Sequence, residues 1–489
     1  MKKFFAFATC IAVITSCQKY VYSDNSSGNM YPVETEESGD RFEPFADNEF
    51  IDVGEEPQST FSVDADGAAY AVARNYINSE FMPYMPPKNA IRIEEFINYF
   101  PFDYAEPQGD ESLAINAEVG DCPWAAKHKL MRLGFKGKSL DNNSRPLSNY
   151  VFLVDVSGSM NSPDKLDLLK KGLIALLPKL DPQDRISIIS YSGKVEKVLE
   201  STLVKDVDVI KDAIDKLIAS GATNGGEAIR MAYREASNNY IEGGNNRIIL
   251  GTDGDFNVGV TSTSALLELV ESYARKGIYL TALGFGMGNL NDAMMERISN
   301  SGNGTYFFID NEYEMTKVFV NEIGKFFSVA NDCKVQVTFN PEYVKSYRLI
   351  GYENRVMSNE DFDNDRKDAA EIGAGQTITA LYEIIPTEAY VTDSHAVATF
   401  DVRYKKELGT ESRSLSMDVN GFGEGSENLR FASAVAAYGM VLRDSKFKGA
   451  ASFDMAKELA QSSLSFDPFD YRKEFVSLID KTAELKIKQ

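Results

Sequence analysis

Three oxygen-bearing side chains alternate along one short stretch of the chain. The apolar run at 151–154 is followed directly by Asp155, Ser157 and Ser159. The apolar run predicts a strand, and the polar residues after it predict a loop that leads into a helix. A carboxylate and two hydroxyls that converge at a strand end suit a hard cation, which prefers oxygen ligands. Alternatively, a serine here merely caps the next helix, and only further ligands downstream decide between the two readings.

Two later loops supply such ligands. Thr223 lies in the glycine-containing loop 220–226, and Asp253 follows the apolar strand at 247–250. In a doubly wound sheet of order 3-2-1-4-5-6, the first and fourth strands are neighbours, and ligands bind where their carboxyl ends meet. Asp155 and Asp253 are therefore expected close together. The predicted metal site comprises Asp155, Ser157, Ser159, Thr223 and Asp253.

The region 149–328 alternates strands with helices, which is typical of a mostly parallel sheet covered on both faces. The pattern predicts strands at 149–155, 185–191, 246–252, 278–285 and 304–309, and helices at 164–180, 206–219, 226–239, 262–276 and 311–327. The glycine-rich stretch 284–288 lacks the spacing of a nucleotide-binding loop, and we interpret it as a turn near the metal crevice.

The region 329–426 changes to a two-residue period, which indicates an antiparallel β-sandwich. The segment 59–148 is expected to be α+β, with strands near 113–119 and 130–135. These two strands lack partners nearby in the sequence, and they would complete the sandwich. The predicted fold class is therefore α/β, with a doubly wound mostly parallel sheet inserted in an antiparallel β-sandwich. Residues 427–489 are expected to form a helical region at the end of the chain.

The first 17 residues have the features of a targeting segment. Lys2 and Lys3 precede an apolar stretch at 4–14 that is too short to span a bilayer. The sequence ending in Cys17 resembles a bacterial lipobox, which implies cleavage before Cys17 and lipid attachment to it. The alternative is an ordinary secretory signal with an incidental cysteine. We expect 18–58 to be a flexible tether and the protein to be exported and lipid-anchored in the cell envelope, in the outer membrane or at the cell surface.

Composition restricts the remaining functions. With Cys17 lipidated, Cys122 and Cys333 form a possible disulfide in an oxidising compartment, and two buried free thiols are the alternative. Only two histidines are present in 489 residues, which disfavours a His-rich zinc site or a Ser-His-Asp triad. The net charge of −22 argues against nucleic acid as a partner.

The combined motif of Asp155, Ser157, Ser159, Thr223 and Asp253 resembles the metal-ion-dependent adhesion site (MIDAS) of von Willebrand factor type A domains. The resemblance covers 149–328. It implies that Ser157, Ser159 and Thr223 coordinate the metal directly. The two aspartates would contact the metal through water, or support the coordinating residues without touching the metal. The runs at 92–100, 252–259 and 347–355 also resemble a group of bacterial lipoproteins in which this domain lies between an N-terminal segment and a C-terminal domain of undefined function.

These observations predict a binding protein. Mg²⁺, or Mn²⁺ or Ca²⁺ in its place, would keep an open position for a carboxylate supplied by a protein partner. We expect no enzyme activity, because the sequence identifies no general base beside a metal-bound water. The alternatives are a metal-assisted hydrolase of the envelope and a scaffold in which the metal only stabilises the fold. Oligomeric state is not predicted.

Overall fold

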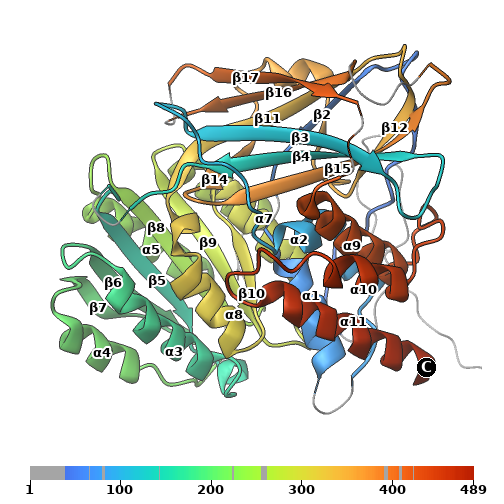
Figure 1. Ribbon diagram of the computed structural model, residues 1–489. Helices are drawn as coiled ribbons and strands as arrows, with labels where there is room; N and C mark the ends of the chain where they lie inside the picture. The colour runs from blue at the N-terminus through green and yellow to red at the C-terminus, as the bar shows by residue number, and fades with distance from the viewer. Residues whose placement is uncertain are drawn as a thin grey trace, which may run out of the picture. The chain divides into compact units, whose positions relative to one another are not determined.

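The computed structural model describes residues 39–64, 66–79, 83–141, 144–222, 225–254, 262–389, 395–406, 410–421, 423 and 425–488. Its α/β domain is built on a six-stranded sheet of order β10-β9-β8-β5-β6-β7 (Figure 1). Neighbouring strands are parallel except at β7, which pairs with β6 in the antiparallel sense. Strand bounds are β5 (Ser148–Asp155), β6 (Arg185–Tyr191), β7 (Val195–Leu203), β8 (Asn245–Thr252), β9 (Ile278–Phe285) and β10 (Tyr306–Ile309).

Helices cover both faces of this sheet because the central strand is apolar on both sides. Phe152 packs in a core with Leu169 and Leu173, whereas Val151 packs on the opposite face with Ile229. The first face is covered by α3 (Leu166–Leu176), α4 (Val207–Asp215) and α8 (Glu312–Thr316). The second is covered by α5 (Gly225–Asn238), α6 (Thr263–Ala274), α7 (Asp292–Ser301) and α1 (Ala68–Asn78).

The strands of a β-sandwich lie both before and after the α/β domain in the sequence. One sheet has the order β1-β12-β15-β4-β3 and the other β13-β2-β11-β16-β17, with β14 paired to β11. Phe135 of β4 pairs with Ile378 of β15, so the α/β domain is an insertion within the sandwich. The bounds are β1 (Ile51–Asp52), β2 (Gln58–Ser62), β3 (Leu113–Asp121), β4 (Lys129–Gly137), β11 (Ser328–Phe339), β12 (Val344–Ile350), β13 (Val356–Met357), β14 (Ala370–Gly373), β15 (Thr377–Pro386), β16 (Ala396–Lys405) and β17 (Arg413–Asn420).

The helical end consists of α9 (Glu427–Leu442), α10 (Phe453–Gln461) and α11 (Tyr471–Lys488). The side chains of α9 are buried over most of its length, and they share a core with α1 and α2 (Ile93–Asn98). Ser426 begins α9, and its hydroxyl accepts a hydrogen bond from the Leu429 amide at 3.2 Å. Within the described residues, no helix combines the length and apolar composition needed to cross a bilayer.

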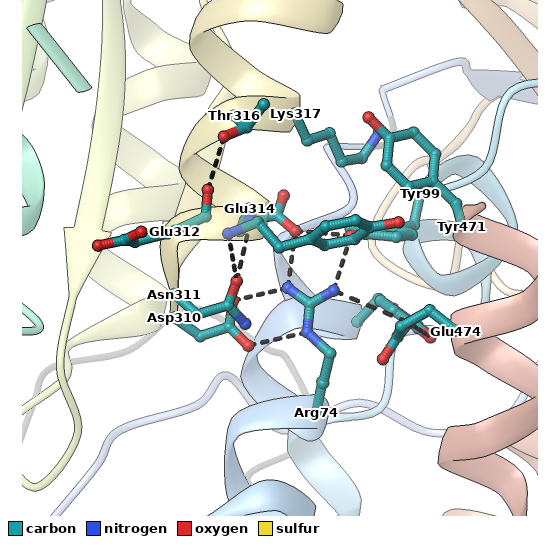
Figure 2. Close-up of polar contacts among 12 residues, drawn as sticks. Arg74, Tyr99, Asp310, Asn311, Glu312, Glu314, Thr316, Lys317, Tyr471 and Glu474 are labelled. Carbon is teal, nitrogen blue, oxygen red and sulfur yellow. Dashed lines mark hydrogen bonds and ion pairs between the residues drawn. The ribbon is translucent and has the colours of Figure 1, made fainter. Parts of the chain in front are cut away.

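A buried polar network joins three parts of the chain (Figure 2). Arg74 of α1 donates to both carboxylate oxygens of Asp310, at 2.8 and 2.6 Å, and to Glu314 of α8 at 2.7 Å. It also donates to the Tyr99 hydroxyl at 2.8 Å and lies 3.9 Å from Glu474 of α11. Figure 2 shows the guanidinium pointing between these groups from the N-terminal segment, the α/β domain and the helical end. Its charge is therefore matched by carboxylates from two other regions.

The structure corrects one expectation for the sandwich and its surroundings and decides another. The predicted tether 18–58 is wrong over its described part, because residues 39–58 bind to the folded chain. Asp40, for example, accepts hydrogen bonds from the amides of Gly288 and Leu290 at 2.8 and 2.9 Å. Of the two alternatives for Cys122 and Cys333, the structure has the two buried free thiols and not the possible disulfide. They lie in separate hydrophobic cores, one with the C-terminal helices and one between the sheets.

Candidate metal centre

Two neighbouring strands bring the predicted site together. β5 ends at Asp155, and β8 ends at Thr252, directly before Asp253. The two strands are parallel neighbours, with Val154 opposite Gly251. This is the adjacency expected for the first and fourth strands of the sheet. It places both aspartates at the carboxyl edge of the sheet. There the strands end, and polar groups are free to bind a ligand.

Asp155 is fully buried, and both of its carboxylate oxygens accept hydrogen bonds. Oδ1 accepts from the Ser157 amide at 2.8 Å, and Oδ2 accepts from the Thr252 hydroxyl at 3.1 Å. Burial raises the pKa of Asp155 above its ordinary value, and the nearby Asp253 adds to this effect. The hydrogen bonds from Ser157 and Thr252 act in the opposite direction and lower the pKa of Asp155. The carboxylate is thereby fixed in orientation behind the loop that follows it.

The two serine hydroxyls point to the same place. Ser157 Oγ lies 3.0 Å from Ser159 Oγ, and Ser157 is buried whereas Ser159 is exposed. The amide of Gly158 donates to the Gly221 carbonyl at 2.9 Å, which brings Gly221 against this turn. Thr223 itself lies outside the described residues. The serine pair thus forms an oxygen-lined surface that is buried at one end and open at the other.

The surroundings of Asp253 test whether a cation fits this site. The residue is 2% exposed, and its Oδ2 lies 3.0 Å from Lys165 Nζ. Within the described part of the chain, its buried Oδ1 has no hydrogen-bond partner. A buried carboxylate oxygen without a partner is costly, so this atom suits a ligand to a cation or to the water around one. The oxygen-only donor set fits Mg²⁺ or a similar hard ion.

Residues that the sequence reasoning missed support the predicted ones. Thr252 is adjacent to Asp253 in sequence, but only the strand pairing shows that its hydroxyl binds Asp155. The spacing of residues in the sequence did not indicate Lys165 as part of the site. Its side chain reaches Asp253 only by folding back from the start of α3. The turn at 284–288 does lie beside this centre, since a Cβ on Gly286 would approach Lys165 Cε to 2.2 Å.

A second carboxylate cluster lies in the sandwich. Ligand oxygens of Asp332, Asp368 and Glu371 all lie within 4.8 Å of one another. Burial raises the pKa of Asp368 to about 7, and the neighbouring Asp332 contributes to the shift. Lys405 pairs with Asp332 and supplies a positive charge of its own. Asp332 lies on β11, Glu371 on β14 and Asp368 in the segment before β14. Only the folded chain brings these residues together, so no local sequence motif indicates the cluster.

Three parts of the chain match known protein families. Residues 149–322 match the family described as von Willebrand factor type A domain, residues 36–132 match one described as von Willebrand factor, and residues 324–485 match the C-terminal domain of YfbK.

Individual relatives cover different parts of the chain. "Uncharacterized protein YfbK" of Escherichia coli (strain K12) is 37% identical over 466 residues, which are 90% of this chain and 80% of that protein. Human inter-alpha-trypsin inhibitor heavy chain H4 is 30% identical over 164 residues, 32% of this chain and 17% of that protein. A crystal structure of the conserved hypothetical protein BatB from Bacteroides thetaiotaomicron is 26% identical, covers 37% of this chain and 98% of that one, and has a TM-score of 0.32.

The match to the E. coli protein covers 90% of this chain, and the three matched families follow one another along it as an N-terminal segment, the α/β domain and a C-terminal part that includes both sandwich strands and the helical end. The chain therefore belongs to the YfbK family of von Willebrand factor type A domain proteins.

Proposed function

We propose that this protein binds a protein partner through a divalent cation held by Asp155, Ser157, Ser159, Thr223 and Asp253. The observation that carries the proposal is the buried Oδ1 of Asp253, which has no hydrogen-bond partner in the described part of the chain. It lies at the same sheet edge as the fixed carboxylate of Asp155 and the paired serine hydroxyls. Von Willebrand factor type A domains are a family in which such a site serves adhesion, which supports the proposal.

Each residue has a separate task in this proposal. Ser157 and Ser159 offer neutral oxygens, Ser159 at the open side, and Asp155 fixes the turn by accepting a hydrogen bond from the Ser157 amide. Asp253 supplies negative charge from the neighbouring strand. When bound, the cation would act as a Lewis acid for a carboxylate of the partner. The serine hydroxyls are neutral, so among the residues of the proposed site only Asp155 and Asp253 offset the charge of the ion. Both carboxylates are buried and neither occupies the open side, where an anionic group of a partner would bind.

The proposal is one of binding without catalysis. Mg²⁺ is the favoured ion because the donors are all oxygen and few in number, and Mn²⁺ or Ca²⁺ would use the same donors. Asp155 is fully buried and already accepts two hydrogen bonds, so its role is to position the loop. A hydrolase would need a base within hydrogen-bond reach of a metal-bound water.

We further propose that the protein is exported and anchored in the cell envelope by lipid on Cys17, which lies outside the described residues. The support is the basic and apolar start of the sequence and its resemblance to a lipobox. Growth with an alkyne-labelled fatty acid should label the wild-type protein and leave Cys17→Ser unlabelled. Equal labelling of both proteins would contradict the anchor.

Metal binding is tested first by calorimetric titration with Mg²⁺ and Mn²⁺. Wild type should bind one ion, and Asp155→Asn should bind it at least about tenfold more weakly, since a charged group that orients the ligands is lost. Asp167→Asn is the matched control, because Asp167 is an exposed carboxylate on α3. The proposal fails if wild type takes up neither ion, or if Asp155→Asn binds as wild type does.

Partner binding is tested by crosslinked pull-down from native envelopes. Wild type and Asp155→Asn are each compared with Mg²⁺ and with EDTA. A protein retained only by wild type with Mg²⁺, and then shown to bind the purified chain with the same metal dependence, supports adhesion. The same set of proteins in all four samples would contradict metal-dependent adhesion and leave a structural role for the metal.

A further inference from the structure

A lysine lies against the metal centre. Lys165 Nζ lies 3.0 Å from Asp253 Oδ2 and 3.0 Å from the carbonyl oxygen of Ser159. Its side chain is only 15% exposed. The ammonium therefore contacts both the charged ligand group from β8 and the turn that carries the serine hydroxyls.

The position of this lysine is built into the fold. Its backbone immediately precedes α3, where its carbonyl accepts the Leu169 amide at 2.9 Å. The stem passes over Gly286, whose φ of +66° and missing Cβ leave the space: an added Cβ would lie 2.2 Å from Lys165 Cε. Both ends of the side chain are thus held, one by the helix start and the other by two oxygens.

This placement changes the charge of the centre. Asp155 and Asp253 contribute two negative charges, and the hydroxyls of Ser157 and Ser159 contribute none. Lys165 adds one positive charge, so the protein groups sum to about −1 rather than −2, by the ordinary charges of these side chains. A divalent cation would then leave the centre with a net positive charge instead of none. In a partly buried site such a charge strongly attracts an anion.

We propose that Lys165 sets the balance between metal affinity and ligand affinity at this centre. Its positive charge weakens the hold on the cation and strengthens the cation's hold on an anionic group from the partner. The inference rests on the proposed function, and it adds the residue that makes an anion the preferred ligand. A residue that merely supported the fold would weaken both affinities when replaced.

The experiment measures the two affinities separately. Mn²⁺ binding is followed by the electron paramagnetic resonance of the free ion, for wild type, Lys165→Gln and Lys165→Met. Acetate is then titrated into each Mn²⁺-saturated protein and followed by water-proton relaxation. Lys165→Gln keeps a donor for Asp253 and removes only the charge, whereas Lys165→Met removes both. Lys171→Met is the control, because Lys171 is an exposed lysine of α3 that pairs with Glu312.

Removing the charge should have opposite effects on the two affinities. We expect both Lys165 variants to bind Mn²⁺ about tenfold more tightly and acetate about tenfold more weakly, as for a unit charge a few ångströms from the ion. Lys171→Met should match wild type in both titrations. Thermal unfolding in EDTA checks that each variant is folded.

The outcomes separate this inference from the proposed function. If wild type binds Mn²⁺ and acetate and Lys165→Gln binds both equally well, the inference is overturned and the proposed function stands. If Lys165→Gln binds Mn²⁺ more weakly, Lys165 only positions Asp253 and the inference is likewise overturned. If Lys165→Gln binds Mn²⁺ while wild type does not, the charge effect is upheld and metal-dependent binding by the wild-type centre is contradicted.

Discussion

The hydroxyl of Thr252 links the ends of the two strands at the candidate metal centre. Thr252 is fully buried at the end of β8, and its donation to Asp155 Oδ2 ties that carboxylate to the strand carrying Asp253. Partners behind a metal site hold its donors in place, and their loss typically weakens metal binding by roughly 10- to 100-fold.

Thr252→Val tests this role. The variant keeps the shape of the side chain and removes the donor, so we expect Mg²⁺ affinity to fall by about tenfold or more while the protein stays folded. Calorimetric titration measures it. Thr281→Val is the control, because Thr281 is an equally buried threonine of β9 that accepts a hydrogen bond from Arg247 at 2.8 Å. A similar loss of metal affinity in the control would show that any buried threonine has this effect.

A buried glutamate makes stability depend on pH. Glu94 is 4% exposed, and burial together with Glu353 raises its pKa from 4.5 to about 7. Its folded-state pKa lies above the unfolded value, so the folded protein holds a proton that the unfolded chain releases between these values. Stability from this group is complete below pH 4.5 and is lost as the pH rises through 7.

Glu94→Gln should remove this dependence, because the amide is neutral at every pH. Relative to wild type, the variant should gain up to about 3 kcal/mol in the free energy of unfolding between pH 4.5 and pH 8. Urea unfolding at several pH values measures the difference. Glu55→Gln, at an exposed position, should follow the wild-type curve. A constant offset between Glu94→Gln and wild type would contradict the titration of Glu94.

The residues of the centre were predictable to different degrees. Asp155 and Asp253 each follow an apolar strand, so their positions could be inferred once the strand order was assumed. Lys165 could not, because its role depends on the space above Gly286, and that space is a property of packing between distant loops.

At the scale of elements, the least predictable strand is β7. It lies at the edge of the α/β sheet and pairs with β6 alone. Charged residues occur along it, including Glu196, Lys197 and Glu200, as is common for edge strands that must avoid pairing with other chains. They obscure its periodicity. By contrast, β5 and β8 are buried throughout and were predicted almost to their ends.

Leu199→Ala tests whether β7 belongs to the packed core. Leu199 is 7% exposed and lies in the core beneath α3 and α4. Its truncation should lower the free energy of unfolding by about 2–4 kcal/mol, through lost burial and the cavity that remains. Glu200→Ala, at the next and exposed position, should change it by less than about 0.5 kcal/mol. Equal effects in urea unfolding would place β7 outside the core.

At the scale of the whole molecule, Arg74 joins regions that are far apart in sequence. It is 1% exposed, and it pairs with Asp310 and Glu314 of the α/β domain beside Glu474 of α11 (Figure 2). No local pattern predicts such a junction, because each charged residue alone has the appearance of an ordinary surface position. The same reason explains why the contacts of residues 39–58 were missed.

Arg74→Met should destabilise the protein by about 3–5 kcal/mol, because it leaves buried carboxylates without their counter-charge. Urea unfolding measures the change. Arg275→Met is the control, since Arg275 forms an exposed pair with Glu271 within one helix and should cost less than about 1 kcal/mol. A loss for Arg74→Met no larger than the control would show that the network does not stabilise the fold.

The insertion of the α/β domain also fixes an order of events during synthesis. The hairpin of β3 and β4 is synthesised early, but β4 also pairs with β15. Phe135 therefore pairs with Ile378 only after the whole α/β domain has been synthesised. At typical rates of translation this delay is roughly 10–50 s. An isolated two-stranded hairpin is only marginally stable, whereas the strands of the α/β domain find their partners within the inserted segment. The nascent chain therefore pairs all the strands of its α/β domain while the surrounding sandwich is still incomplete and the edge of β4 that pairs with β15 is open.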